Sequence, residues 1–593
     1  MTDLDIPAHL RRARLELEGV PGYQLLQDWS WLPTVHRWAL RFRLCHAVHD
    51  SSPIAGETDW VLTVSSGYPW GGITVYPAKE NGITATFPHQ SLNEEGETIL
   101  PHRTGNLCLG IMTQDWQIRH GLSEPHTVEE RLRWHVERTN EWIERARAGT
   151  LFRSGEEWEP PARAHEDLNM QILFGEQAAA CGDKAERRGL VELLFPDPAK
   201  LLLFADRFIS LNEPAFSAAS QLGVGLAVGQ AAWGTTVNTS KLALTGVWIQ
   251  LTEAPVFPAW RLPMTWGELR DFYQAKEHAS LDAHITEVVQ RAGRNAERVA
   301  YLLLGYPVPT KIGDSQFRLQ WEACSLPKAS AGGRLPSDEQ RLVWANVHDQ
   351  RALMRQIRGQ LSPELGQKTL MLIGAGALGS SVAELLVRGG VNQLDIADGE
   401  TLQLGNLVRH TLTVSDLGIN KAVAVAARLN ASSLDARVRA FPENLSSQRL
   451  SVFMEREPDI VLDTTGSDQV LSDLAGWHRP TLFFSASLGL YARRIYLFAA
   501  RQEQFPVDVF HSQMQPWLKR DREETKGLPL PATEGIGCWS PVFPARLDDI
   551  SLLASAAVKW IEECVALPLL APQLTVFERE GKAGCFIGVR RLQ

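Results

Sequence analysis

Hydrophobic and polar residues alternate in short blocks over the first 150 positions of the chain. Apolar positions at helical spacing after Asp5 predict an opening helix. Thr127 and Glu130 have the spacing of a capping box, and the apolar positions that follow them predict a second helix. Between the two helices, apolar-rich runs predict strands at 38–45, 60–65 and 72–76. The pattern therefore predicts a compact α+β unit over residues 1–150.

The next part of the chain has a less regular pattern. Residues 151–164 contain adjacent glutamates and adjacent prolines, which are typical of a linker. Residues 165–335 combine strand patterns with helical ones, and one helix is predicted to begin at a second capping box, formed by Thr265 and Glu268. No group of residues there has the pattern of a catalytic site. We expect an α/β linker domain.

From residue 338 to residue 593, strand patterns alternate with helical patterns. This alternation predicts a mainly parallel sheet whose strands are connected by helices. A chain of 593 residues is also too long for a single hydrophobic core. We therefore predict a multidomain α/β and α+β protein with domains at 1–150, 165–335 and 338–593.

Composition narrows the class of protein. Hydrophobic residues make up 44% and charged residues 22%, and the net charge of -10 is spread without a long block of one sign. Nonspecific nucleic-acid binding is therefore not expected. No apolar run is long enough to cross a membrane, and the N-terminus does not have the pattern of a signal peptide. We expect a cytoplasmic protein that binds neither nucleic acid nor membranes.

A nucleotide site is predicted where an apolar strand, 369–373, leads into Gly374, Gly376 and Gly379. Glycines in this context let the backbone approach phosphates at a helix N-terminus. A second predicted strand ends at Asp398, whose carboxylate is placed to accept hydrogen bonds from ribose hydroxyls. These features alone favour an NAD-dependent oxidoreductase. The glycine pattern by itself, however, does not separate NAD from ATP.

The residues that follow favour ATP. Asn406 and Arg409 supply an amide and a cation, Lys421 supplies a second cation, and Asp463 ends a later predicted strand. Cations stabilise a departing pyrophosphate and a carboxylate can coordinate magnesium, whereas hydride transfer needs no such set. We therefore predict ATP and Mg as ligands, with Asp463 as the metal ligand.

These residues, in this order, resemble the adenylation domain of ubiquitin-like activating enzymes and their sulfur-carrier relatives. The match runs from about Arg351 to Asp463. The resemblance implies that Arg409 and Lys421 take part in adenylation. The element 353–357 also resembles the Arg-Gln-Ile element of that family, in which the arginine reaches the partner subunit's ATP. By this resemblance Arg355 is an ATP-binding residue and the protein is a homodimer.

Two of the seven cysteines lie where a thioester could be carried. Cys538 follows the nucleotide-binding pattern, near the position at which activating enzymes carry the thiol that attacks the acyl-adenylate. Cys108, with Tyr68-Pro69 before it and Trp116 after it, resembles the active-site cysteine of ubiquitin-conjugating enzymes. No CxxC pair occurs, so neither a disulfide framework nor a structural zinc site is expected.

The region before Cys108 departs from the conjugating family. The His-Pro-Asn element of that family ends eight residues before the cysteine, where this chain has Leu100. The segment 87–90 is expected to lie too far upstream to replace it, and His102 is expected to be only a neighbour. The residue that takes over the oxyanion-stabilising role of the asparagine is left open, and an inactive conjugating-like fold remains an alternative.

The order of the three parts resembles the fused activating and conjugating enzymes of bacterial anti-phage operons, especially those of cyclic-oligonucleotide signalling (CBASS). The resemblance implies adenylation of a protein C-terminus, transfer to Cys538 and then Cys108, and conjugation to a lysine of an acceptor protein. The activated protein is expected to be a nucleotidyltransferase or a ubiquitin-like protein. Two alternatives are a sulfur-carrier adenylyltransferase, which often carries the CxxC pairs missing here, and a noncatalytic scaffold.

Overall fold

The computed structural model describes most of the chain as two compact units. The first comprises residues 1–193, 197–230 and 243–348, and the second comprises 194–196, 231–242 and 349–593. The description leaves out residues 1–4, 48–52, 110–123, 164–169, 176–186, 211–226, 231–232, 241, 257–259, 292–298, 327–335, 352–358, 454, 527–532, 535–539, 542–543, 583–584 and 593. The predicted domain boundaries remain predictions.

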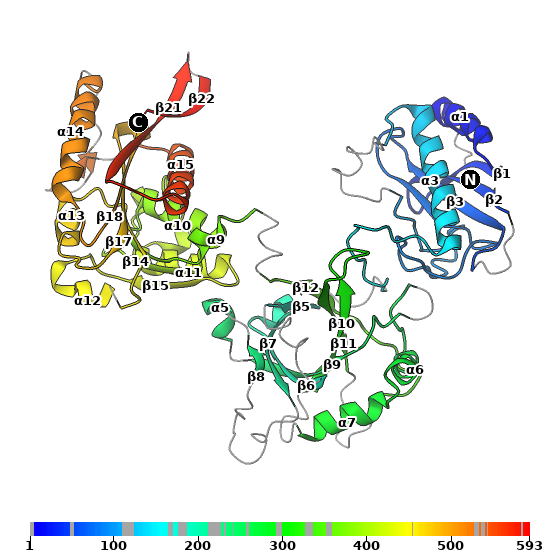
Figure 1. The fold of residues 1–593 in the computed structure, drawn as a ribbon. Coiled ribbons are helices and arrows are strands. Elements are labelled where there is room, and N and C mark those ends of the chain that lie inside the picture. The colour runs from blue at the N-terminus through cyan, green and yellow to red at the C-terminus, as the bar shows by residue number, and fades with distance from the viewer. Residues whose placement is uncertain are drawn as a thin grey trace. The chain divides into compact units, whose positions relative to one another are not determined.

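The N-terminal part of the first unit is an antiparallel sheet covered by two helices (Figure 1). Its strands pair in sequence order, and their bounds are β1 (Tyr23–Leu32), β2 (Arg37–Cys45), β3 (Glu57–Ser65) and β4 (Ile73–Pro77). The helices are α1 (Ala8–Leu15) and α3 (Val128–Ala148). The Thr127 side chain accepts a hydrogen bond from the Glu130 N–H, which confirms the predicted helix start.

The second sheet of this unit has eight strands and carries two helices. Its strand order is β11-β10-β9-β6-β7-β5-β12, with β8 paired to β7. The strands are β5 (Gln171–Phe174), β6 (Arg188–Leu194), β7 (Leu202–Ser210), β8 (Ala227–Gln230), β9 (Ala243–Gln250), β10 (Val299–Pro309), β11 (Phe317–Ser325) and β12 (Asn346–Asp349). The helices are α6 (Trp266–Glu277), which begins at the predicted cap Thr265, and α7 (Leu281–Arg291).

The second unit is built on another eight-stranded sheet, in the order β15-β14-β13-β16-β17-β18-β21-β22. The strands from β15 to β17 are parallel, and the remaining pairings are antiparallel. Their bounds are β13 (Thr369–Ile373), β14 (Gln393–Ala397), β15 (Arg437–Phe441), β16 (Ile460–Asp463), β17 (Thr481–Leu488), β18 (Arg494–Gln502), β21 (Gln573–Lys582) and β22 (Cys585–Arg591). A separate pair is formed by β19 (Thr533–Glu534) and β20 (Ser540–Pro541).

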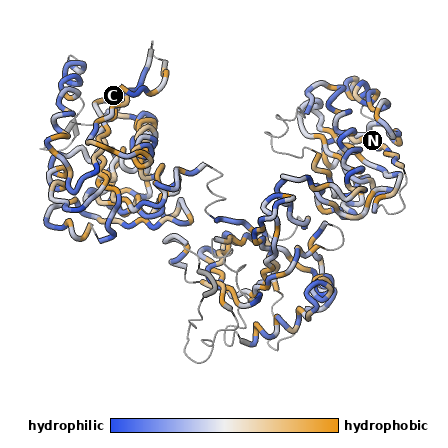
Figure 2. The backbone as a smooth tube through the Cα atoms, in the orientation of Figure 1, coloured by the Kyte–Doolittle hydropathy of each residue, from blue (hydrophilic) through white to orange (hydrophobic). Residues whose placement is uncertain are grey.

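Helices pack against both faces of this sheet, each over its own hydrophobic core. One face carries α10 (Ala377–Arg388), α11 (Lys421–Ser432) and α15 (Leu547–Ala566). The other carries α12 (Leu450–Phe453), α13 (Asp468–Leu474) and α14 (Val507–Glu524). The central strands are largely hydrophobic, whereas much of α14 is hydrophilic (Figure 2). The short helices α5 (Thr235–Asn238) and α9 (Pro363–Gly366) complete the unit.

The arrangement confirms the α/β architecture predicted for the C-terminal part. Because β13, β14, β16 and β17 run parallel, their carboxyl ends meet at one edge of the sheet, where ligands bind in folds of this class. Within the part of the chain that is described, no helix is both long and apolar enough to cross a membrane.

Candidate active site

The glycine loop places the start of α10 in front of the sheet edge. Gly374 has a φ of 91°, a conformation that disfavours a side chain. A Cβ on Gly379 would lie 2.0 Å from the Gly374 carbonyl oxygen, so glycine is what allows α10 to pack this closely. A Cβ on Gly376 would meet no protein atom within 4 Å, and no side chain caps this end of α10. The uncapped backbone N–H groups therefore suit an anionic ligand.

Asp398 ties this loop to the end of β14. Its carboxylate oxygens accept hydrogen bonds from the Ala375 N–H, at 2.7 Å, and the Glu400 N–H, at 2.8 Å. The Asp398 side chain is buried. Since each carboxylate oxygen has a further lone pair, these bonds leave room for the predicted contact with a ribose.

His410 fastens the segment with Asn406 and Arg409 to the same loop. Its Nδ1 accepts a hydrogen bond from the Leu412 N–H, so its Nε2 carries the proton and donates to the Ala375 carbonyl, at 2.7 Å. Burial lowers the pKa of His410. Asn406 accepts a hydrogen bond from the Gln403 N–H, and the half-buried Arg409 follows one turn later. His410 was not among the predicted site residues.

Lys421, the first residue of α11, is buried and paired with a flexible carboxylate. Its Nζ lies 2.5 Å from the Glu400 carboxylate, and its N–H donates to the Glu400 carbonyl. The Lys421 side chain is 8% exposed, whereas the Glu400 side chain is 71% exposed. A phosphate that approached Lys421 would therefore replace a partner that can move out into solvent.

Asp463 lies at the end of β16 and is fully buried. One of its oxygens accepts from the Thr465 N–H and hydroxyl, and the other accepts from the Ser485 hydroxyl. Burial raises the pKa of this carboxyl group. A metal ion bound here would have to take the place of hydroxyl donors. By contrast, Asp468 at the start of α13 has a side chain that is 86% exposed.

A cavity of about 560 Å³ opens beside the glycine loop. It lies between the start of α10, the loops after β16 and β17, and one side of α14. Its size falls in the usual range for ligand sites. Leu378, Thr465, Leu490, Leu518 and Arg522 are among its lining residues, so the cavity presents apolar and polar groups to a similar extent.

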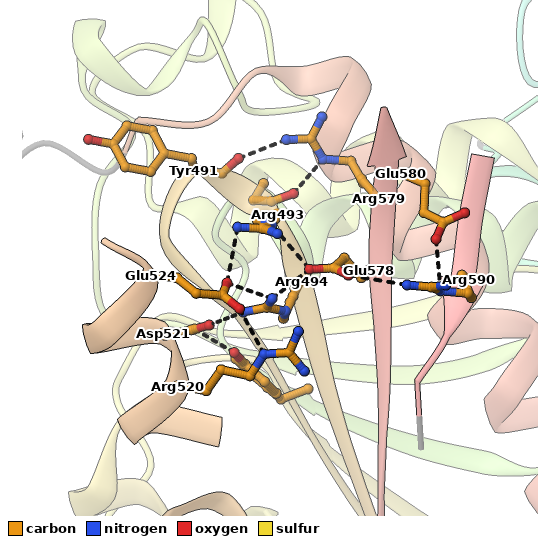
Figure 3. A network of polar contacts seen from close by, with 12 residues as sticks. Tyr491, Arg493, Arg494, Arg520, Asp521, Glu524, Glu578, Arg579, Glu580 and Arg590 are labelled. Carbon is orange, nitrogen blue, oxygen red and sulfur yellow. Dashed lines mark hydrogen bonds and ion pairs between the residues drawn. The ribbon is translucent and has the colours of Figure 1, made fainter. Parts of the chain in front are cut away.

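A buried ion network forms the wall behind this cavity (Figure 3). Arg494 of β18 is 1% exposed and pairs with Asp521 and Glu524 of α14, at 2.5 and 2.6 Å, and with Glu578 of β21, at 2.6 Å. The Tyr496 hydroxyl also donates to Asp521, which lines the cavity. The network fixes the C-terminal end of α14 to the sheet.

Cys108 lies in a loop made from two segments that are far apart in the chain. Its N–H donates to the His89 carbonyl, at 2.9 Å, and Leu107 forms a bridge with Gln90. The segment 87–90, expected to lie too far upstream to replace the His-Pro-Asn element, lies directly beside Cys108 in the fold, because the intervening residues loop away. His102 is buried and stacked on Tyr76, in agreement with its expected minor role.

The side-chain amide next to this loop has other partners. The Gln90 amide donates to the Gly105 carbonyl and accepts from the Phe87 N–H, and Gln90 is buried. This amide therefore stabilises the loop. Burial of the thiol raises the pKa of Cys108, and the negative charge of Glu159 raises it further, although the residue as a whole is exposed.

Three predicted residues, Arg355, Cys538 and Trp116, lie outside the described residues. The described residues contain no group of three or more His, Cys, Asp or Glu side chains that could hold a metal ion. The structure brings Gly374, Gly376, Gly379, Asp398 and the ends of β14 and β16 together at one sheet edge.

The fold and the glycine-loop edge are those of an adenylating enzyme of the ThiF class. The ThiF family model matches residues 348–536, and the model of the Cap2 central linker domain matches residues 225–361. A sulfur carrier protein adenylyltransferase of Thermus thermophilus is 28% identical over 29% of this chain and 64% of its own length. The solved structure of Escherichia coli MccB with succinimide matches with a TM-score of 0.28 and 13% identity, over 38% of this chain and 64% of that chain.

The whole chain matches a fused relative. The ATP-dependent ubiquitin transferase-like protein Cap2 of Enterobacter hormaechei is 31% identical over 95% of this chain and 95% of its own length. The chain belongs to the Cap2 family of ATP-dependent ubiquitin transferase-like proteins. This result confirms the predicted fusion of activating and conjugating enzymes, and the sulfur-carrier alternative accounts for far less of the chain.

Proposed function

We propose that this enzyme uses ATP to adenylate a protein C-terminus at the glycine-loop edge. The observation that carries the proposal is the uncapped start of α10 beside the buried cation of Lys421. Those N–H groups, with Arg409 and Lys421, are suited to hold the phosphates, and Asp398 to hold the ribose. Mg²⁺ would neutralise phosphate charge, with Asp463 as its predicted ligand.

The cavity beside this loop is the proposed position of the protein's C-terminal residues. A carboxylate oxygen attacks the α-phosphorus, the bond to the bridging oxygen breaks, and pyrophosphate leaves. The chain's own contribution is to hold the nucleotide and the carboxylate at adjacent places, because positioning alone accounts for a large part of such a rate enhancement.

The acyl group then moves to sulfur. The Cys538 thiolate attacks the carbonyl carbon and AMP leaves, and the Cys108 thiolate next takes the acyl group in an exchange between thioesters. A lysine amine of the acceptor finally forms an amide bond and releases Cys108. Joining both thiols in one chain raises the effective concentration of each near the other.

The activated protein is proposed to be a nucleotidyltransferase of a CBASS operon or a ubiquitin-like protein, and the site of action the cytoplasm. The enzyme is further proposed to be a homodimer in which Arg355 reaches the partner subunit's ATP. Light scattering at micromolar concentration should then give twice the mass of 66.0 kDa. A fully active monomer would contradict the homodimer.

The relay is tested with two cysteine variants and a candidate nucleotidyltransferase or ubiquitin-like protein as the activated protein. On nonreducing gels, Cys538→Ala should still release pyrophosphate but carry no reducible adduct. Cys108→Ala should keep a reducible adduct on Cys538 and form no conjugate. Cys45→Ala is the matched control, since Cys45 belongs to β2 and not to the loop. Normal conjugation by Cys108→Ala would refute the relay.

A further inference from the structure

Two glutamates from outside the conjugating-like fold approach the Cys108 loop. The segment 151–164, predicted to be a simple linker, packs here: Leu151 is buried in the core of the N-terminal sheet. The Glu159 carboxylate accepts from the His89 N–H, at 2.9 Å, and lies 2.8 Å from His89 Nδ1. Glu156 lies 3.6 Å from His89 Nε2.

His89 connects Glu159 to Cys108 through its backbone. Its φ of 60° is unusual for a residue with a side chain and is maintained by bonds on both sides. The N–H is bound to Glu159, and the carbonyl accepts from the Cys108 N–H. His89 thus acts as a positioning residue that places a carboxylate near a thiol.

The charge of Glu159 reaches the sulfur, since it raises the pKa of the Cys108 thiol. A negative charge at this place opposes formation of the thiolate, so it does not serve to activate Cys108 as a nucleophile. The same charge attracts a cation. A lysine acceptor arrives as an ammonium ion and has to lose a proton before its nitrogen can attack a carbonyl.

We propose that Glu159 is the acceptor-amine site of the conjugating-like part, where it binds the lysine ammonium and takes one of its protons. This inference rests on the proposed role of Cys108 as a thioester carrier. The neutral amine attacks the carbonyl carbon, a C–N bond forms, and the C–S bond breaks. The second nitrogen proton goes to the departing sulfur, which regenerates the Cys108 thiol. Glu159 returns its proton to water.

The surroundings of Glu159 fit an amine that comes from solvent. The Glu159 side chain is 33% exposed and Cys108 is exposed, whereas the Glu156 side chain is only 13% exposed. Both oxygens of Glu156 face Arg153, through its N–H and its Nε, whereas both contacts of Glu159 with His89 use a single oxygen, Oε2. Glu159 is therefore the more suitable of the two carboxylates for a protonated amine.

The test uses full-length protein with Cys538→Ala, charged on Cys108 by a glycine-terminated peptide supplied as a mercaptoethanesulfonate thioester. The Cys108→Ala form is the blank, and intact mass measures the charge. Discharge is then followed with free lysine or with hydroxylamine, which is uncharged at neutral pH. Glu159→Gln should slow discharge to lysine on the order of 100-fold and leave discharge to hydroxylamine nearly unchanged.

Two further variants separate charge from structure. Glu159→Asp keeps the carboxylate and should recover much of the lysine rate. Glu157→Gln changes the exposed neighbouring glutamate and should behave like the unmodified chain. If Glu159→Gln slowed discharge equally with lysine and with hydroxylamine, or slowed it with neither, the proposal would be overturned. Failure of Cys108 to accept the peptide at all would instead show that the carrier role of Cys108 is wrong.

Discussion

The glycine-loop edge and the Cys108 loop use carboxylates in opposite ways. At the edge of the sheet, Asp398 and Asp463 are buried and their oxygens accept protein hydrogen bonds, so they stabilise the loops that surround a ligand. At the Cys108 loop, Glu159 is one-third exposed and its charge adds to the raised pKa of the Cys108 thiol. In this protein the rigid site therefore uses buried acids that accept hydrogen bonds from the protein, whereas the acid proposed to meet an incoming partner lies at the surface.

The largest expected effect concerns the buried network behind the sheet edge. Arg494→Met leaves three carboxylates without their shared cation and should lower the free energy of unfolding by about 3–5 kcal/mol. Arg520→Met is the matched control, because Arg520 is exposed and makes a single i,i+4 pair with Glu524; it should lower the same quantity by less than about 1 kcal/mol. Urea unfolding measures both, and equal losses would contradict a special role for burial.

The next effect tests which acid serves the nucleotide. Asp463→Ala should reduce ATP–pyrophosphate exchange on the order of 100-fold or more if it is the metal ligand. Asp468→Ala, at the exposed start of the following helix α13, should leave exchange nearly unchanged. If only Asp468→Ala reduced exchange, Asp468 would be the metal ligand. The sheet edge and the Cys108 loop would then both use a surface carboxylate.

A smaller effect separates two glycines of the loop. Gly379→Ala brings a methyl group against the Gly374 carbonyl and should destabilise the C-terminal unit by about 1–3 kcal/mol. Gly376→Ala meets no protein atom, so it should leave thermal stability unchanged but reduce the stabilisation that ATP produces. Thermal melts with and without ATP measure both. A normal ATP shift in Gly376→Ala would show that phosphates do not approach there.

The smallest effect is acid sensitivity at the sheet edge. Because burial lowers the pKa of His410, the unfolded chain binds a proton more readily than the folded one. The stabilisation from neutral His410 is complete above its ordinary pKa and decreases as pH falls below about 6.5. His410→Gln should therefore flatten the decline in melting temperature between about pH 7 and pH 5.5. An unchanged slope would contradict this assignment.

How far the sequence predicted these regions depended on how each is built. The bounds predicted for β13 agree with the structure, and β14 ends within one residue of the predicted Asp398, because buried parallel strands appear as continuous apolar runs. The strand β1 was not predicted. Most of its residues are exposed or half-buried, and even Leu25 and Leu26 are 37% and 41% exposed, so its pattern does not resemble a core strand.

The sheet edge and the Cys108 loop also differ in how far the sequence predicted them. The residues predicted to bind a ligand at the sheet edge follow strand ends. Their order along the chain was therefore informative for Asp398 and Asp463. The Cys108 loop joins 87–90, 105–109 and 156–159 through irregular segments, for which distance along the chain carries little information. The signals for His89 and Glu159 were present, as a histidine beside a proline and acids in a presumed linker, but only the fold connects them.

The pairing of one buried arginine, Arg494, with three carboxylates also has a consequence for how the sequences of relatives differ. Losing the arginine alone would leave Asp521 without its cation and leave Glu524 and Glu578 with more exposed arginines such as Arg493, and losing one acid would leave a buried cation only partly compensated. Lysine cannot substitute, because it lacks the planar fork that reaches several carboxylates at once. These four positions should therefore change together or not at all. An alignment of distant relatives should show joint replacement by apolar residues wherever the arginine has been lost.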